Sequence, residues 1–185
     1  MKRIVAAALI GWVVMSVWVF VVNGIYGFRH SIDMKEVPDD RQLYADLKRM
    51  IAEPGRYMVN PTLIETGFPA NEPVYSIQYS GIGHEAAGRG ETVNLILGLA
   101  ACLIATWMLS RSTDRVLASY IRRVLFFFTI GLFLVVAVEL PKCGIGGYPM
   151  SDAIKLAVNT LVQWTVVGLV VGMIMRPAAD KVRVS

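Results

Sequence analysis

The sequence contains few of the residues on which most catalytic and metal sites depend. Among its 185 residues are two histidines and two cysteines, and the cysteines form neither a Cys-x-x-Cys pair nor a haem-attachment sequence. Glycine-rich phosphate loops, nucleophile motifs and the paired carboxylates of acid–base enzymes are also absent. We therefore expect a non-catalytic protein without a cofactor, and no catalytic residue is predicted.

Charge is scarce as well, which argues against an ordinary soluble domain. Only 17% of the residues are charged and 55% are hydrophobic, and the charges are bunched between long apolar runs. A bilayer core of about 30 Å requires roughly 20 helical residues, and lipid offers backbone amides no partner outside a helix. The sequence predicts an all-α membrane protein with four transmembrane helices, at residues 4–28, 92–110, 124–140 and 153–175.

The first apolar run begins like a signal peptide, with Lys2 and Arg3 in front of it. It continues almost unbroken to Phe28, well beyond the roughly 7–15 residues of a signal-peptide core, and no small-x-small cleavage site follows. We interpret it as an uncleaved membrane anchor.

Lysine and arginine are distributed unevenly between the two sides that these helices define. Nine of them lie at the N-terminus, in the loop 111–123 and in the tail 176–185, beside two acids, Asp114 and Asp180. The other side has nine with twelve acids. Because basic residues are retained in the cytoplasm, we expect a bacterial inner-membrane protein with both termini cytoplasmic. The net charge of +4 then reflects topology, and nucleic acid is not an expected partner.

Residues 29–91 form a segment too long for a loop without structure of its own. A helix is predicted from Asp39, with acids in its first turn and an end at Pro54-Gly55. Strands are predicted at residues 56–59 and 74–79. We expect a small α+β extracytoplasmic domain here, too small for an independent core, and a short outer loop at residues 141–152.

Part of this pattern resembles a family of uncharacterised small bacterial inner-membrane proteins. The resemblance covers residues 1–111: an apolar anchor, an amphipathic helix, EPGRYMVNP, NEPVYSIQY and a return helix ending in MLSR. Members typically have a Gly-x-Tyr-x-x-Pro stretch before a strand containing Pro-Val. Gly55, Tyr57 and Pro61 stand in the corresponding places, with one residue more before the proline. Around His30 the chain lacks the prolines usual in the family. The resemblance implies the same architecture and no particular activity.

Metal or haem binding at the outer surface is one alternative that the sequence leaves open. His30, His84 and Cys143 are the candidates, but no two of them have a chelating spacing such as i, i+4 on a helix. We expect interfacial polar residues here. A disulfide between Cys143 and Cys102 is not expected, because Cys102 lies midway along the second helix.

The fourth helix carries the strongest candidate site. Asp152, Lys155, Asn159 and Gln163 follow one ridge from the outer surface to the bilayer centre. Glu139, at the outer end of the third helix, is a further candidate because an acid within a membrane span is often functional. The ridge either makes hydrogen bonds within the bundle or receives a ligand or another subunit's helix.

Small residues mark the predicted helix contacts. Gly168 and Gly172 form a small-xxx-small pair on the side of the fourth helix opposite the ridge. Gly98 and Ala105 lie on a similar face of the second helix, whereas residues 126–128, three phenylalanines, indicate that the third helix faces lipid.

These features together favour an accessory or assembly subunit of a larger inner-membrane complex, with lipid and other integral membrane subunits as its partners. Both faces of the fourth helix require protein neighbours, and the outer domain requires support. The alternatives are a small-molecule-binding membrane protein or membrane enzyme, with its site between the outer domain and the ridge, and the metal- or haem-binding protein described above.

Overall fold

The computed structural model describes residues 1–59, 74–83, 86–144 and 147–176. In this part of the chain, four helices are long and apolar enough to cross a membrane: Lys2–Ile25, Arg89–Ser110, Tyr120–Lys142 and Met150–Ile174. The prediction of four such helices with a small two-stranded sheet is confirmed.

Several of these helices are composite. The first consists of α1 (Lys2–Val19) and a π-helical continuation, η1 (Phe20–Ile25), and the second is α4 (Ala87–Ser110). The third combines α6 (Tyr120–Leu134), the π-helical η3 (Val135–Glu139) and a 3-10 turn, η4 (Leu140–Lys142), and the fourth is α7 (Met150–Ile174). The shorter elements are α2 (Phe28–Asp33), α3 (Asp40–Met50), β1 (Gly55–Val59), β2 (Tyr75–Tyr79) and α5 (Asp114–Ala118).

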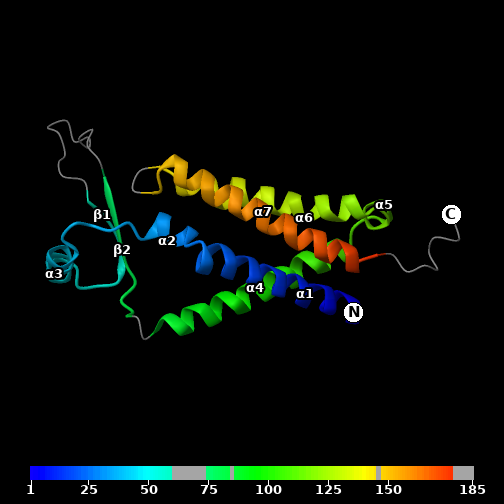
Figure 1. Ribbon diagram of the computed structural model, residues 1–185, viewed down its shortest axis with the longest axis horizontal. Helices are drawn as coiled ribbons and strands as arrows, with labels where there is room; N and C mark the ends of the chain where they lie inside the picture. The colour runs from blue at the N-terminus through cyan, green and yellow to red at the C-terminus, as the bar shows by residue number, and fades with distance from the viewer. Residues whose placement is uncertain (60–73, 84–85, 145–146, 177–185) are drawn as a thin grey trace, which may run out of the picture.

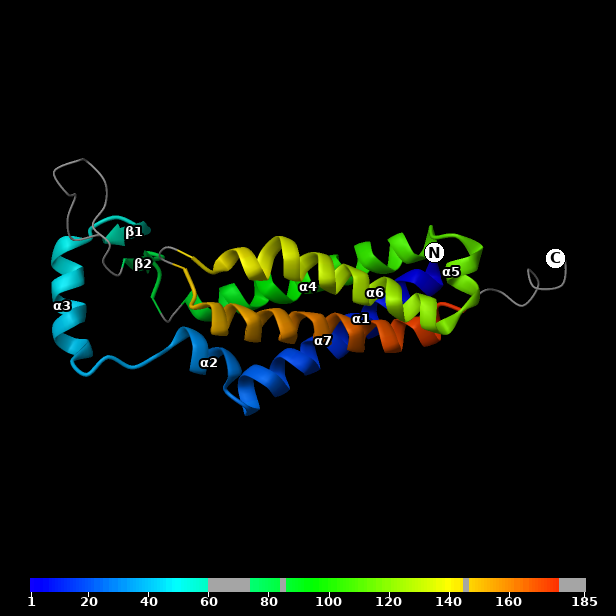
Figure 2. The same cartoon turned by 90° about the horizontal axis from the view of Figure 1, so that it is seen from above.

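The long helices run roughly along one axis (Figures 1 and 2). α1 begins and α7 ends at one end of this bundle, the termini end, whereas α3 and the strands lie at the other, the sheet end (Figure 1). α7 packs between α6 and α1, and α4 packs against α1. Towards the sheet end, α4 diverges from α7 (Figure 1).

Glycines set the two closest helix contacts. A Cβ atom on Gly168 of α7 would stand 2.6 Å from Cβ of Phe127 on α6, and one on Gly11 of α1 would stand 2.8 Å from Val171 of α7. Phe127 is fully buried and stacks on Trp164. The prediction that residues 126–128 face lipid is therefore wrong for Phe127, because Gly168 provides a space that its side chain fills.

Two arginines bind the end of α7 at the termini end. Arg3 donates from Nε to the carbonyl oxygen of Ile174 (2.9 Å), and the buried Arg123 donates from Nε to that of Gly172 (2.8 Å). The last carbonyls of a helix have no partners within it, and cations at this position also favour the helix dipole. The two arginines thus cap the C-terminal end of α7.

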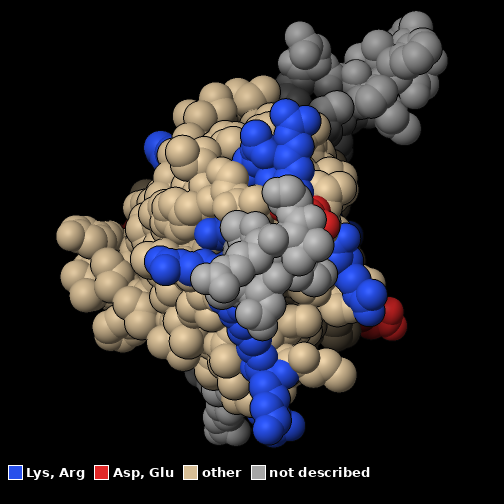
Figure 3. Space-filling model, turned by 90° about the vertical axis from the view of Figure 1, so that its right-hand side faces the viewer, with Lys and Arg blue, Asp and Glu red and all other residues tan. Residues whose placement is uncertain are grey.

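Basic side chains gather on the termini end, as Figure 3 shows. In the described chain, seven basic residues and one acid, Asp114, lie at the helix ends and in the short connection here; the seven are Lys2, Arg3, Arg111, Arg115, Arg122, Arg123 and Arg176. The charge asymmetry of the sequence is therefore also an asymmetry of the folded molecule.

The unit between α2 and α4 follows the predicted order of helix and strands. Asp39 caps α3 by accepting a hydrogen bond from the backbone of Gln42, and β1 and β2 pair antiparallel, with Tyr57 opposite Ile77. None of the residues of α3 is buried. This agrees with the expectation that the unit is too small to have a core of its own.

The predicted end of the first helix was wrong. The predicted helix extended to residue 28, but the π-helical turn ends at Ile25, and Gly27 adopts a left-handed conformation (φ 60°). Helix α2, which was not predicted, follows directly and buries Ile32.

Candidate functional site

A polar cleft of about 720 Å³ opens between η1, α4, η3 and α7 at the sheet end of the bundle. Its apolar walls include Val19, Phe20 and Leu156. The polar side chains that line this cleft are Asn23, Arg29, Glu91, Asn94, Glu139, Asn159, Thr160 and Gln163.

The structure divides the predicted ridge of α7 into two parts. Asn159 and Gln163 line the polar cleft. Asp152 is instead buried beside it, where it accepts from Lys155 (2.8 Å) and Lys35 (3.2 Å). Lys155 is exposed. The deeper half of the ridge thus belongs to the cleft, and the outer half fastens the segment after α2 to α7.

The two π-helical turns supply lining residues from α1 and α6. Asn23 lies in η1 and Glu139 in η3, and π turns within α-helices are frequent at functional sites. Glu139 is largely buried and accepts from Lys142 (2.7 Å) and Thr160 (3.2 Å). The predicted candidate Glu139 therefore lies in the same cleft as Asn159 and Gln163.

The cleft ends where small residues bring the helices together. Gly98 of α4 lies against Trp12 of α1, whose indole donates to the carbonyl oxygen of Leu95 (3.0 Å). Further towards the termini end, Cys102 and Ala105 are buried. On the same stripe of α4, towards the sheet end, stand Glu91 and Asn94. The predicted small face of the second helix thus forms the floor below the cleft.

Hydrogen bonding in the cleft is incomplete among the described residues. The indole of Trp18 donates to Oδ1 of Asn159 (3.0 Å). Oδ1 of Asn23 is buried and accepts no hydrogen bond, and the side chains of Asn94 and Gln163 make none. A buried polar atom ordinarily has a partner, so Oδ1 of Asn23 is available to a bound molecule. The side chains of the exposed Asn94 and the half-buried Gln163 are available as well.

A second polar cleft, of about 760 Å³, lies between the strands and the end of the bundle. Its lining includes Asp33, Ser76, Gln78, Lys142 and Tyr148. Two ion pairs join it to the first cleft, because Asp33 pairs with Arg29 (3.2 Å) and Lys142 with Glu139. Tyr148 donates to Asp33 (2.6 Å), and this hydrogen bond, followed by burial, raises the pKa of Tyr148. This second cleft is separate from the polar cleft between η1, α4, η3 and α7, because no described residue lines both.

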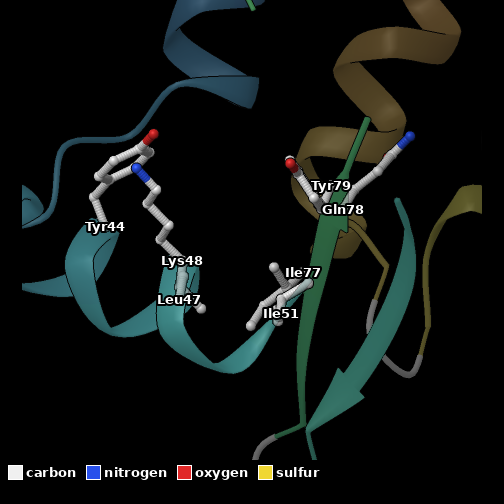
Figure 4. Close-up of a pocket in the computed structure, with 7 residues that line it drawn as sticks. All are labelled: Tyr44, Leu47, Lys48, Ile51, Ile77, Gln78 and Tyr79. Carbon is white, nitrogen blue, oxygen red and sulfur yellow. The ribbon is translucent and has the colours of Figure 1, made fainter. Parts of the chain in front are cut away.

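The other face of the strands forms a smaller groove with α3, of about 220 Å³ (Figure 4). Leu47 and Ile51 point towards Ile77 of β2, while Tyr44 and Lys48 stand at one rim and Tyr79 at the other. Tyr75 and Ser76 thus line the second cleft, Ile77 and Tyr79 line this groove, and Gln78 contributes to both.

The candidate metal ligands are not brought together in the described residues. His30 is exposed and its Nδ1 lies 3.3 Å from the sulfur of Met34. Cys143 is half-buried and Cys102 is buried, and neither forms a disulfide. His84 lies outside the described residues. No group of three His, Cys, Asp or Glu residues that could hold a metal ion occurs in the described part of the chain.

Five polar residues that line the polar cleft were not predicted from the sequence: Asn23, Arg29, Glu91, Asn94 and Thr160. Asn23 interrupts an otherwise apolar run, and Glu91 and Asn94 are three apart at the start of a helix. A search for polar residues on one face of each apolar helix, rather than on α7 alone, would have found Glu91 and Asn94.

Comparison with known proteins adds no further guidance. The chain matches no protein-family model, and searches of curated proteins and of solved structures found no similar protein.

Proposed function

We propose that the protein is a multi-pass protein of the bacterial inner membrane that binds a polar ligand in the polar cleft. Membrane insertion is supported by the four apolar helices, many of whose large hydrophobic side chains are exposed, such as Val17, Ile96 and Phe133. The excess of basic residues supports a cytoplasmic termini end, with the sheet end on the other side.

The observation that carries this proposal is the polarity of the cleft at the depth of the apolar spans. Gln163 is the fourteenth residue of α7, about 20 Å along it at 1.5 Å per residue. Amide groups at such depth are costly unless they have partners. Asn23 and Asn94, nearer the sheet end of their helices, line the same cleft as Gln163, and all three leave hydrogen-bonding groups unused. This arrangement suits a ligand better than it suits helix packing.

The proposal is tested with Gln163→Leu. Gln163 makes no hydrogen bond with a described residue, so leucine removes a ligand contact without breaking an internal one. Native mass spectrometry of the detergent-extracted protein should show a bound small molecule on the wild type. Gln163→Leu should lose it at unchanged thermal stability, and Thr129→Val, on an exposed face of α6, should keep it. A wild type without bound molecules would contradict the proposal.

An accessory or assembly subunit remains the second candidate function, for a different reason from the one the sequence offered. Gly168 and Gly172 contact α6 of the same chain, so they need no second subunit. The support now comes from α3, whose Leu43, Tyr44 and Met50 are exposed. A partner subunit would cover them. Blue-native electrophoresis after mild extraction should then show a complex that Leu43→Glu dissociates, whereas a ligand-binding monomer would migrate unchanged.

A further inference from the structure

The polar cleft continues into the apolar surface of the bundle. Val19 and Phe20 line it, yet Phe20 is 68% exposed on the outside of the span. On the opposite side, the first half of α4 stands away from α7 (Figure 1) and exposes every residue from Glu91 to Leu97. A molecule in the cleft would therefore contact polar groups at one end and membrane-facing apolar side chains at the other.

The charges of the cleft are balanced except for Glu91. Arg29 pairs with Asp33, and Glu139 pairs with Lys142. Glu91 has no ion pair among the described residues, so the lining has an excess of one negative charge. A ligand that brings a positive charge would neutralise it, and charge-assisted hydrogen bonds are the stronger ones.

The unused acceptor in the cleft indicates the same chemistry. Oδ1 of Asn23 is buried without a donor, and Glu91, as a carboxylate, offers acceptors only. A group with several N–H donors would satisfy both. A primary ammonium provides three donors and a positive charge, whereas a quaternary ammonium provides the charge alone.

Arg29 offers the complementary contact at the rim of the cleft. Its guanidinium donates to Asp33 and also interacts with Tyr148, and guanidinium has five N–H donors in all. The remaining donors suit a phosphate, for which arginine has a favourable planar geometry. An ammonium beside Asn23 and Glu91 and a phosphate near Arg29 would place an attached apolar chain beside Val19 and Phe20.

On the basis of the proposed function, we infer that the ligand is a membrane lipid with a primary ammonium and a phosphate in its headgroup. The headgroup contacts Asn23, Glu91 and Arg29, and an acyl chain lies against Val19 and Phe20. A soluble phosphorylated amine shares the headgroup chemistry but leaves the apolar wall of the cleft unused.

The test compares lipids that share acyl chains and differ in the headgroup. The purified full-length protein is exchanged into detergent with equal amounts of phosphatidylethanolamine, phosphatidylcholine and phosphatidylglycerol, and native mass spectrometry measures which lipid it retains. The wild type should retain phosphatidylethanolamine roughly tenfold over the other two, as expected for one charge-assisted hydrogen bond. Glu91→Gln should remove this preference. Glu36→Gln, at an exposed carboxylate outside the cleft, should keep it.

Two outcomes would overturn the inference while leaving the proposed function intact. Retention of all three lipids equally, while Gln163→Leu still loses bound molecules, would show a cleft without selectivity for an ammonium headgroup. Complete displacement of lipid by millimolar soluble phosphoethanolamine would show that the apolar chain contributes nothing and that the ligand is soluble. Absence of any Gln163-dependent binding would overturn both proposals together.

Discussion

At the scale of single residues, Gly168 and Gly172 differ although they belong to one sequence motif. A Cβ on Gly168 would lie 2.6 Å from Phe127 and 3.3 Å from a backbone oxygen, whereas one on Gly172 would meet side chains at 3.4–3.6 Å. Gly168→Ala should therefore destabilise the protein by about 1–3 kcal/mol through overpacking. Gly172→Ala should be neutral or slightly stabilising, because alanine favours helix by up to about 1 kcal/mol.

Thermal unfolding of the two alanine variants in detergent tests this difference. Both contacts are made with α6 of the same chain, so the loss should appear in the monomer. Equal stability of Gly168→Ala and Gly172→Ala would contradict the packing described for α6 and α7.

The sequence identified residues of the polar cleft only where spacing on one helix was informative. Asn159 and Gln163 share a face of α7, and this follows from helical periodicity. Glu139 and Asn23 line the same cleft, but this could not be predicted. Each lies in a π-helical turn, where one extra residue per turn changes the side of the helix on which the following residues lie. Apolar residues on both sides of Asn23 carry no signal for such a turn.

At the scale of elements, one hydrogen bond connects α2 to the turn before α7, and it should depend on pH. Tyr148 donates to the carboxylate of Asp33, which, with burial, raises the pKa of Tyr148 above its ordinary value of 10.0. The protonated tyrosine is thus favoured by folding. Its contribution to stability is complete below about pH 10 and is lost as the pH rises through the raised pKa.

Unfolding temperatures of the wild type and Tyr148→Phe, measured between about pH 8 and pH 11.5, test this dependence. At pH 8 the wild type should be more stable than Tyr148→Phe, by the free energy of one hydrogen bond to a charged group. This difference in stability should disappear at the highest pH of the series. Tyr75→Phe, an exposed tyrosine of β2, is the control. A constant difference for Tyr148→Phe would mean that Asp33 does not accept from it.

Helix existence was predictable and helix arrangement was not. Long apolar runs give the four helices because their length and composition leave few other structures. The divergence of α4, which opens the polar cleft, depends on where Trp12 meets Gly98 and leaves no periodic pattern in the sequence. Helix α2 was missed because six residues, Phe28–Asp33, are too few for periodicity to identify.

At the scale of the whole molecule, the charge asymmetry predicts the orientation in the membrane. A reporter active only outside the cytoplasm should work when fused after Gly55, at the sheet end, and fail after Thr113, at the termini end. Activity after Thr113 would reverse the molecule and place the polar cleft in the cytoplasmic half of the bilayer. Replacing Arg111 and Arg115 by glutamine serves as a control, because it should weaken the orientation without altering the helices.

The bonds from arginine to the last turn of α7 have a consequence for biogenesis. During synthesis α1 emerges before α7, so Arg3 lacks its acceptor at Ile174, and Gly11 its contact with Val171, until α7 has been translated. The close contact of Gly11 with Val171 and the acceptor at Ile174 form together, in one late step. An interrupted chain lacks both, and Gly11, which is buried in the complete fold, loses its contact with α7. A protease that removes unfinished chains would have these two missing contacts by which to distinguish them from complete ones.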